Sequence, residues 1–251
     1  MQNSIKFIGH STVLIDVCGV KILTDPNLAR FVFGMPRLKR LDTNIDDLNQ
    51  ADIILISHSH RDHLNNPTLK KISKKIPIAI HNESKNHLEE HKFKKIIGFE
   101  YWQERDLFDK KIKLTFVPAK HKRTLLLNPK GKAGGFVIET SEANIYFAGD
   151  TAFDKDIFSQ IAEKFKIGIL LMPIGAYYPR WILKNIHTDP EEALRAMEII
   201  GAEKMIPIHW GSFMMSLDTP NESAEVLKEK IKGTPFEKKV LILKNGETHY
   251  F

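Results

Sequence analysis

The chain has 251 residues, a length that suits one large α/β domain or two small ones. Hydrophobic residues make up 42% of the sequence, which is enough for a buried core and excludes a largely disordered protein. The formal net charge is +6, but the lysines are scattered and indicate ordinary solvated surfaces rather than a charge-driven partner. A single cysteine, Cys18, excludes an internal disulfide and a cysteine-rich metal site.

The N-terminal residues show no basic start followed by a long apolar core, so no secretory signal is predicted. No apolar run approaches the ~18 residues that a membrane-spanning helix needs. We therefore expect a cytoplasmic protein without a transmembrane segment.

The beginning of the chain predicts three strands, near residues 5–8, 12–17 and 20–23. Residues 27–41 follow without a clear period and mix phenylalanines with arginines and lysines. A loop packed over the core is the favoured interpretation of this segment. The alternative is an apolar and basic lip that contacts lipid or substrate.

Three of the 11 histidines lie within six residues, directly after the apolar run 52–57. In an extended strand the side chains of His58 and His60 point the same way, so together they can bind one metal ion. Asp62 and His63 lie past the strand end, where the chain turns and where they can face a second ion. Four ligands are too many for one site that also draws on distant residues, so the spacing favours two metals.

The rest of the chain alternates strands and helices, without a linker or a low-complexity tract. This alternation predicts one domain over residues 1–251 with an α/β fold, a four-layer αββα sandwich of two mixed sheets flanked by helices. The predicted helices are 66–75, 82–91, 155–165 and 190–200, with another after 219–220, and the predicted strands are 76–80, 111–118, 135–140, 144–148, 167–172, 204–208 and 240–243, with a hairpin turn at 128–131 and a short C-terminal strand.

Ligand-type residues follow several of these apolar runs. His121, Asp150 and His209 each come just after a predicted strand, as the cluster at 58–63 does. Ligands gather at the carboxyl ends of the strands in α/β sheets, so we expect all of these residues on one rim. A lone histidine after a strand is usually structural, but seven ligand-type residues at strand ends favour a metal centre.

The string His-Ser-His-Arg-Asp-His at 58–63 resembles the metal-binding motif of the metallo-β-lactamase superfamily of hydrolases. Almost the whole chain, from Phe-Ile-Gly-His-Ser-Thr at 7–12 onward, resembles one subgroup, the N-acyl-phosphatidylethanolamine-hydrolysing phospholipase D enzymes and their bacterial relatives. The other strings that carry this resemblance are Thr-Asp-Pro at 24–26, Lys-Arg-Thr at 122–124, Gly-Asp-Thr at 149–151, Pro-Ile-Gly-Ala-Tyr-Tyr-Pro-Arg-Trp at 173–181, His-Thr-Asp-Pro-Glu-Glu-Ala at 187–193 and Ile-His-Trp-Gly-Ser-Phe at 208–213. The resemblance implies the metallo-β-lactamase fold and a metal-dependent hydrolase.

Carried over residue by residue, the resemblance implies a binuclear metal centre. The first ion is assigned to His58, His60 and His121, the second to Asp62, His63 and His209, and Asp150 bridges the two. Zinc is the expected metal, with Mn²⁺ or Fe²⁺ as alternatives. Two such ions lower the pKa of a shared water toward ~7, and the resulting hydroxide attacks phosphorus or a carbonyl.

The resemblance also implies other site residues. His187 matches a histidine that this family places beside the scissile phosphate, where it could protonate or hydrogen-bond the leaving group. The catalytic residues are thus Asp62, Asp150 and His187. A substrate wall is assigned to Tyr177, Tyr178, Arg180 and Trp181, of which Arg180 suits a phosphate.

Two further polar residues near the start of the chain allow alternatives. Asp25 is a candidate acceptor for a ligand imidazole, with a role in a turn as an equal alternative. His10 is interpreted as a structural polar residue in preference to such a supporting role.

The leading functional hypothesis is a phospholipase D-like phosphodiesterase, with N-acyl-phosphatidylethanolamine as one candidate substrate. A lactonase acting on a sugar-phosphate or acyl lactone is the alternative. A nuclease ranks low because the sequence has no RNA-binding motif, and a di-iron oxygen or nitric oxide protein is disfavoured because those relatives need a carboxylate where this chain has His60. The expected partner is a small-molecule or lipid phosphodiester and not a nucleic acid; peripheral membrane contact and a homodimer are compatible with the resemblance.

Overall fold

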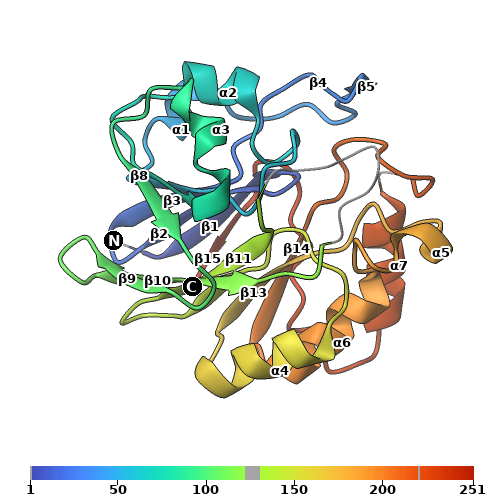
Figure 1. Ribbon diagram of the computed structural model, residues 1–251. Helices are drawn as coiled ribbons and strands as arrows, with labels where there is room; N and C mark the ends of the chain where they lie inside the picture. The colour runs from blue at the N-terminus through green and yellow to red at the C-terminus, as the bar shows by residue number, and fades with distance from the viewer. Residues whose placement is uncertain (1, 122–130, 220) are drawn as a thin grey trace.

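A computed structural model describes residues 2–121, 131–219 and 221–251 of the chain. The basic string at 122–124 and residues 128–130 of the predicted hairpin turn lie outside these ranges. Two mixed sheets pack against each other, and helices lie on the outer side of each sheet (Figure 1). The predicted αββα sandwich is therefore confirmed.

The first sheet has seven strands in the order β15-β1-β2-β3-β6-β7-β8. Its N-terminal strands pair antiparallel, and β3, β6, β7 and β8 continue it as parallel neighbours. Its strands are β1 (Ser4–Gly9), β2 (Thr12–Val17), β3 (Val20–Thr24), β6 (Ile53–Leu55), β7 (Ile78–His81), β8 (Ile96–Phe99) and β15 (Thr248–Tyr250).

The second sheet has six strands in the order β14-β13-β12-β11-β10-β9. Strands β9 to β12 pair antiparallel, whereas β12, β13 and β14 are parallel. Its strands are β9 (Glu104–Leu107), β10 (Ile112–Pro118), β11 (Gly134–Glu139), β12 (Ile145–Phe147), β13 (Ile169–Pro173) and β14 (Lys204–Ile208).

The main core fills the space between the two sheets. Phe99 of the first sheet meets Phe136 of the second edge to face, with ring centroids 5.6 Å apart, and Phe116 packs on Phe136 at 4.9 Å. All three rings are fully buried. Such large buried rings contribute several kcal/mol each to folding, and they fix the two sheets relative to each other.

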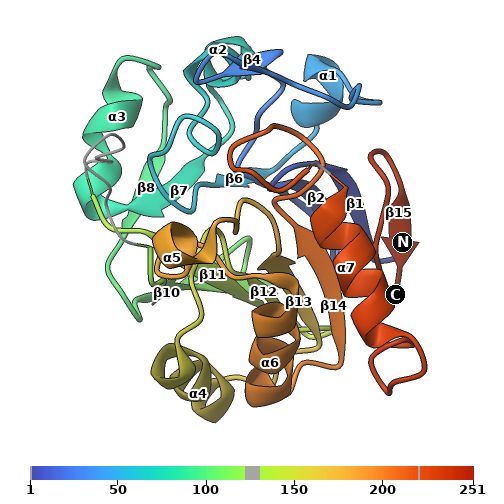
Figure 2. The same cartoon turned by 90° about the vertical axis from the view of Figure 1, so that its right-hand side faces the viewer.

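The helices divide into two groups (Figures 1 and 2). One group lies over the first sheet, where a second core buries Leu48, Leu69 and Leu88 from three short helices. The other lies along the second sheet, with α4 against α6 and α6 against α7. The helices are α1 (Ile45–Leu48), α2 (Asn66–Lys71), α3 (Asn86–Glu89), α4 (Lys155–Lys164), α5 (Arg180–Leu183), α6 (Pro190–Ile200) and α7 (Glu222–Ile231).

Helix α6 begins and ends as its sequence predicts. The Asp189 side chain accepts the backbone N–H of Glu192, and the Glu192 side chain accepts the N–H of Asp189. Gly201 adopts φ 70° at the C-terminal end, where a residue with a side chain is strained. The helix is thereby fixed at both ends.

Three predicted elements differ from the structure. Helix α2 stops at Lys71 and not at residue 75, because the Ser73 N–H donates to the Asn49 side chain at 2.8 Å instead of to a helical carbonyl. The predicted helix 82–91 is a 3-10 turn at Asn82–Ser84 followed by the single turn of α3. The predicted strand 240–243 is reduced to one bridge, between Val240 and Met205.

The segment 27–41 also departs from its favoured interpretation. It forms the short hairpin of β4 (Phe31–Val32) and β5 (Met35–Pro36), and only Val32 of the hairpin strands is buried. Phe31 is 61% exposed and Phe33 is also exposed, so the expectation that these aromatics pack over the core is wrong. Positive φ angles at Phe33 and Gly34 close a tight turn, so that this part of the segment pairs with itself as a hairpin instead of forming a loop packed on the core.

Candidate metal centre

The ends of several strands converge at one edge of the two sheets. The cluster 58–63 follows β6, Asp150 follows β12 and His209 follows β14, all of them at the carboxyl ends of parallel strands. His121 follows β10 of the second sheet. The structure brings these residues together within ligand distance of one another, as expected from the topology.

Three histidines form the first cluster. His60 Nδ1 lies 2.8 Å from His58 Nε2 and 3.1 Å from His121 Nε2. The Nδ1–H of His121 donates to the carbonyl of Ile186 at 2.8 Å, so its Nε2 carries a lone pair. One proton on His60 cannot satisfy two nitrogen lone pairs, whereas a cation among the three nitrogens can.

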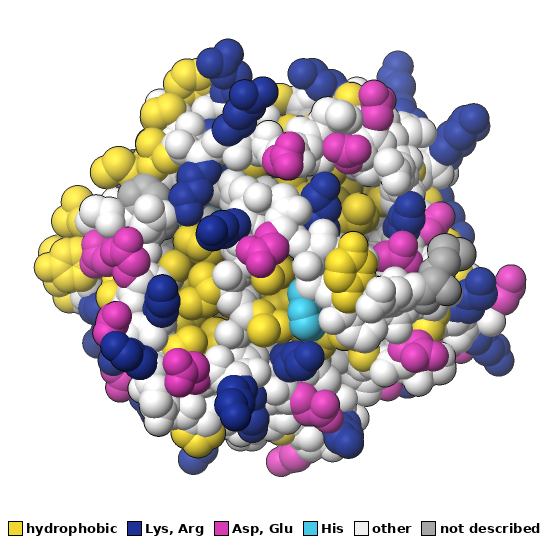
Figure 3. Space-filling model, turned by 180° about the vertical axis from the view of Figure 1, so that it is seen from behind, with side chains coloured by type: hydrophobic (Ala, Val, Ile, Leu, Met, Phe, Trp, Pro, Cys, Tyr) yellow, Lys and Arg dark blue, Asp and Glu magenta, His cyan; other side chains and the backbone are white. Residues whose placement is uncertain are grey.

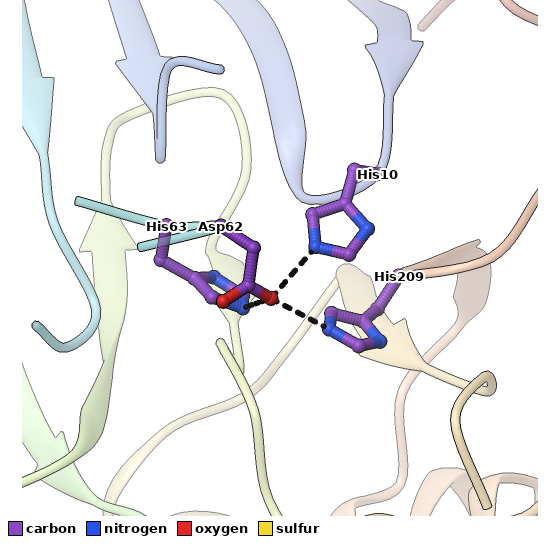
Figure 4. A group of neighbouring side chains, drawn as sticks. All are labelled: His10, Asp62, His63 and His209. Carbon is purple, nitrogen blue, oxygen red and sulfur yellow. Dashed lines mark hydrogen bonds and ion pairs between the residues drawn. The ribbon is translucent and has the colours of Figure 1, made fainter. Parts of the chain in front are cut away.

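The second cluster surrounds Asp62 (Figure 4). Its Oδ2 atom lies 3.1 Å from His63 Nε2, 3.5 Å from His209 Nε2 and 3.0 Å from His10 Nε2. The ligand atoms of these four buried residues all lie within 4.8 Å of one another. A carboxylate among imidazoles is a donor set that divalent zinc-like ions take.

Asp150 lies between the two clusters. Its Oδ2 is 3.0 Å from His63 Nε2 and 3.1 Å from His209 Nε2 in the second cluster, and 3.9 Å from His58 Nε2 in the first. The residue is 1% exposed, and its Oδ1 has no hydrogen-bond partner in the part of the chain that the structure describes. A buried carboxylate oxygen without a donor is costly, and a bound cation would satisfy it.

Asp25 holds one ligand of each cluster. Its Oδ2 lies 2.6 Å from His63 Nδ1 and accepts the Ser57 hydroxyl at 2.6 Å, while Oδ1 accepts the Ser57 N–H at 2.8 Å. The Ser57 oxygen in turn is 3.0 Å from His58 Nδ1. These contacts leave Nε2 of both histidines for a metal. Of the two roles considered for Asp25, the structure therefore gives it the supporting one.

The two clusters differ in charge before an ion binds. Burial and neighbouring imidazoles hold the pKa of His58 well below its ordinary value and lower that of His60 to about 4, so these rings are neutral and ready to bind metal. Burial also opposes the charged form of His209, but Asp150 and Asp62 outweigh it and raise its pKa to about 9. An ion entering the second cluster must therefore displace a proton from His209.

The residues predicted for catalysis and substrate binding lie beside the clusters. His187 Nδ1 is 3.8 Å from Asp150 Oδ2 and is buried without a hydrogen-bond partner within the described ranges. Arg180, expected to face a phosphate, instead donates to Glu192 at 2.6 Å and to the carbonyl of His187 at 2.9 Å. Its guanidinium is thereby committed to holding His187 against α6.

The aromatic residues of the predicted substrate wall do not form one continuous wall. The Tyr177 hydroxyl is 3.4 Å from Glu222 of α7, and its N–H donates to Asp218. Tyr178 is exposed, and Trp181 is 80% exposed on α5. These two rings face solvent at the surface rather than a closed pocket.

The sequence did not indicate that His10 lies within the second cluster. It sits in the turn between β1 and β2, 52 positions from Asp62, and it is buried in the second cluster. The interpretation of His10 as a merely structural residue omitted this contact. The signal that could have found it is its position inside the string at 7–12 that carries the family resemblance.

A search for possible membrane-spanning helices found none among the described residues. The longest helix that the structure describes, α6, has 11 residues.

Comparisons with known proteins agree with this geometry. The profile of the family described as "Beta-lactamase superfamily domain" matches residues 20–210. An N-acyl-phosphatidylethanolamine-hydrolyzing phospholipase D of Caenorhabditis elegans is 30% identical over 92% of this chain and 72% of its own length. A metal-dependent hydrolase of Aeropyrum pernix is 29% identical over 98% of this chain and 97% of its own.

A solved structure shows the same fold. The isothiocyanate hydrolase from Delia radicum gut bacteria superposes with a TM-score of 0.83, covering 99% of both chains at 23% identity. At this level of identity the likeness concerns the fold alone.

Proposed function

The chain belongs to the metallo-β-lactamase superfamily and is a metal-dependent hydrolase, and from this premise we propose that it is a binuclear zinc phosphodiesterase acting on a membrane lipid. The observation that carries the proposal is the position of Asp150, with one oxygen within 3.9 Å of ligand nitrogens from both clusters. Two ions that share a carboxylate suit in-line displacement at phosphorus.

The residues present fit two divalent ions. His58, His60 and His121 would hold one ion, Asp62, His63 and His209 the other, and Asp150 would contact both. When bound, such ions supply a hydroxide nucleophile at neutral pH and neutralise charge that develops on the substrate oxygens. Nitrogen and carboxylate donors in a buried, four-ligand arrangement favour zinc over magnesium or calcium.

His187 is placed to assist the leaving group. Burial holds the pKa of His187 well below its ordinary value, so the ring is neutral and offers one N–H. Arg180 fixes the backbone of His187 through its carbonyl. We assign His187 the role of donating a hydrogen bond to the leaving oxygen, in keeping with the predicted role.

A lipid substrate is supported by the surface around the metal centre. Hydrophobic side chains gather along the edge of the molecule that carries β4, β5 and α5 (Figure 3). Backbone hydrogen bonds join the segments of this edge, from Leu38 to Ser212 at 2.9 Å and from Leu217 to Tyr178 at 3.0 Å. We call the exposed apolar residues of these segments the apolar rim: Phe31, Phe33, Leu38, Tyr178, Trp181, Ile182, Met214 and Leu217.

The apolar rim is also basic. The segments 28–41, 178–184 and 213–217 that carry it contain no aspartate or glutamate. Arg180 pairs with Asp189 and Glu192, which leaves Arg30, Arg37, Lys39, Arg40 and Lys184 as the basic residues of the rim. Exposed aromatic and aliphatic side chains beside basic ones are the pattern of proteins that rest on an anionic lipid surface. The rim adjoins the centre, because Phe213 contacts the His10 ring at 5.5 Å and lies under Arg37 at 4.4 Å.

Replacing Trp181 and Leu217 together by serine is expected to weaken binding to phosphatidylglycerol vesicles by at least about tenfold, since each side chain removed from the interface forfeits roughly 1.5–3 kcal/mol of apolar burial. Cosedimentation measures this. The matched control is Tyr250→Ser, because Tyr250 is also an exposed apolar residue but lies on β15, outside the rim. Equal vesicle binding by the double variant and the control would contradict a lipid-facing rim.

The proposed reaction is tested with metal-stripped protein. Reloading with Zn²⁺ is expected to restore hydrolysis of N-acyl-phosphatidylethanolamine, as the name of the Caenorhabditis elegans relative suggests, and of a soluble phosphodiester. Lactones are assayed in parallel. No gain in diester cleavage on reloading would reject the proposal, and a gain confined to lactones would replace it with a lactonase.

A further inference from the structure

His10 lies in a turn with a strained backbone conformation. It follows the shifted register of β1 and β2 at Gly9, and its own φ is 60°, a left-handed conformation that non-glycine residues rarely adopt. Such strain costs on the order of 1–3 kcal/mol and persists where the surroundings hold it. In this conformation the residue is buried, with 3% of its surface exposed, and its imidazole faces Asp62.

This one residue contacts two members of the second cluster. The His10 Nε2 atom lies 3.0 Å from Asp62 Oδ2, and its backbone carbonyl accepts the N–H of His209 at 2.9 Å. The rings of His10 and His209 also pack against each other, with centroids 4.1 Å apart and planes tilted by 40° (Figure 4). The β1–β2 turn therefore fixes both a carboxylate ligand and an imidazole ligand that come from distant parts of the chain.

His10 differs from His63 and His209, the other two histidines near Asp62, in which ring nitrogen is available to donate a hydrogen bond. His63 gives its Nδ1–H to Asp25, so its Nε2 has a lone pair for an ion. His209 likewise faces both Asp62 and Asp150 through Nε2. With those two nitrogens turned to an ion, His10 is the group among these four that can donate an N–H to the Asp62 carboxylate.

We propose that His10 is a positioning residue of the second metal site, which donates its Nε2–H to Asp62 and holds His209 through its carbonyl. The inference rests on the two-ion centre of the proposed function. Groups that orient metal ligands in this way typically change metal affinity by about 10- to 100-fold when they are removed. The role requires a donor at the Nε2 position and not imidazole ligation.

The test compares His10→Phe, which keeps a ring but removes the donor, with His10→Gln, which keeps a donor of similar reach. The affinity for the first and second Zn²⁺ is measured by competition with a chromogenic chelator, and the Co²⁺-loaded proteins are compared by absorption spectroscopy. His81→Phe is the matched control, because His81 is also buried and packs against Tyr101 and Phe116, but belongs to no metal-capable group among the described residues.

We expect His10→Phe to weaken binding of the second ion by about 10- to 100-fold and to leave the first nearly unchanged. His10→Gln should recover most of the loss, and His81→Phe should bind both ions normally. The proposal is overturned if His10→Phe binds two ions like the parent protein. It is equally overturned if His10→Gln loses the second ion as completely as His10→Phe, since the imidazole would then act by ligation or packing.

Failure of this inference can be distinguished from failure of the proposed function. If His10→Phe does not fold, His10→Leu replaces it as the variant without a donor: loss of the second ion by His10→Leu with its recovery in His10→Gln supports the proposal, and normal binding by His10→Leu overturns it. If the parent protein itself binds fewer than two ions, the two-ion function fails and the inference about His10 falls with it. If the parent binds two ions and hydrolyses diesters but the His10 variants match it, only the present inference is rejected.

Discussion

Replacement of Asp150 by alanine is expected to lower kcat/KM for phosphodiester hydrolysis by at least about 10³-fold. Asp150 is the residue whose carboxylate reaches ligand nitrogens of both clusters, at 3.0–3.1 Å in the second and 3.9 Å in the first. Without it, two like-charged ions would lie close together with no shared anion between them. We therefore also expect fewer than two ions per chain, measured by elemental analysis beside the steady-state kinetics.

The matched control for this variant is Asp106→Ala. Asp106 is an aspartate on the edge strand β9, and its side chain is exposed. It should retain two ions and the parent rate. An Asp150→Ala protein that keeps two ions and works within about tenfold of the parent would show that the carboxylate does not join the clusters.

The second large effect is expected at Asp25, which is fully enclosed beneath the centre. Asp25→Ala leaves the Nδ1–H of His63 and both donors of Ser57 buried without an acceptor. Breaking a buried pair of this kind typically costs about 3–5 kcal/mol, and losing the contact to a metal-bound imidazole weakens metal binding by about 10- to 100-fold. Chemical denaturation of the metal-free protein measures the first effect, and chelator competition measures the second.

Asp52→Ala is the control for this prediction. The Asp52 carboxylate also accepts one backbone N–H, that of Lys21 at 2.8 Å, but it is exposed and touches no metal-capable residue that the structure describes. Its loss should cost only about 1 kcal/mol and leave metal affinity unchanged. The role of Asp25 would be refuted by equal stability and equal metal affinity in the two variants.

Much of the centre could be predicted because strand ends are readable from the sequence. Apolar runs of strand length precede His58, Asp150 and His209, and parallel strands bring their carboxyl ends to the same edge. The resemblance to the superfamily then implied which residues share an ion. The structure brings His58, His60 and His121 within ligand distance of one another, and it brings Asp62, His63 and His209 together in a group that also contains His10.

What could not be predicted depends on contacts between distant segments. Helix α2 stops early because of a bond from Ser73 to Asn49, 24 positions away, which leaves no trace in local periodicity. The place of His10 depends on a positive φ in a turn and on a partner 52 positions on. Arg180 looked suited to phosphate as a residue type, yet its partners, Glu192 and His187, are fixed by how α5 meets α6.

The solvent exposure of the hairpin at β4 and β5 also could not be predicted from the sequence. A run of aromatic and basic residues is compatible with a buried loop or with a surface that binds lipid, since composition alone does not give solvent exposure. The structure places Phe31 in solvent, on a hairpin that is followed by Leu38, whose N–H donates to the carbonyl of Ser212. Such a patch on a surface is itself a reason to expect a partner.

Crystals of the protein grown with zinc, with data collected at the zinc absorption edge, would locate the metals directly. We predict two anomalous peaks, one among His58, His60 and His121 and the other among Asp62, His63 and His209, with an oxygen of Asp150 within bonding distance of each. A single peak, or peaks outside these two clusters, would contradict the two-ion centre and with it the proposed hydrolytic chemistry.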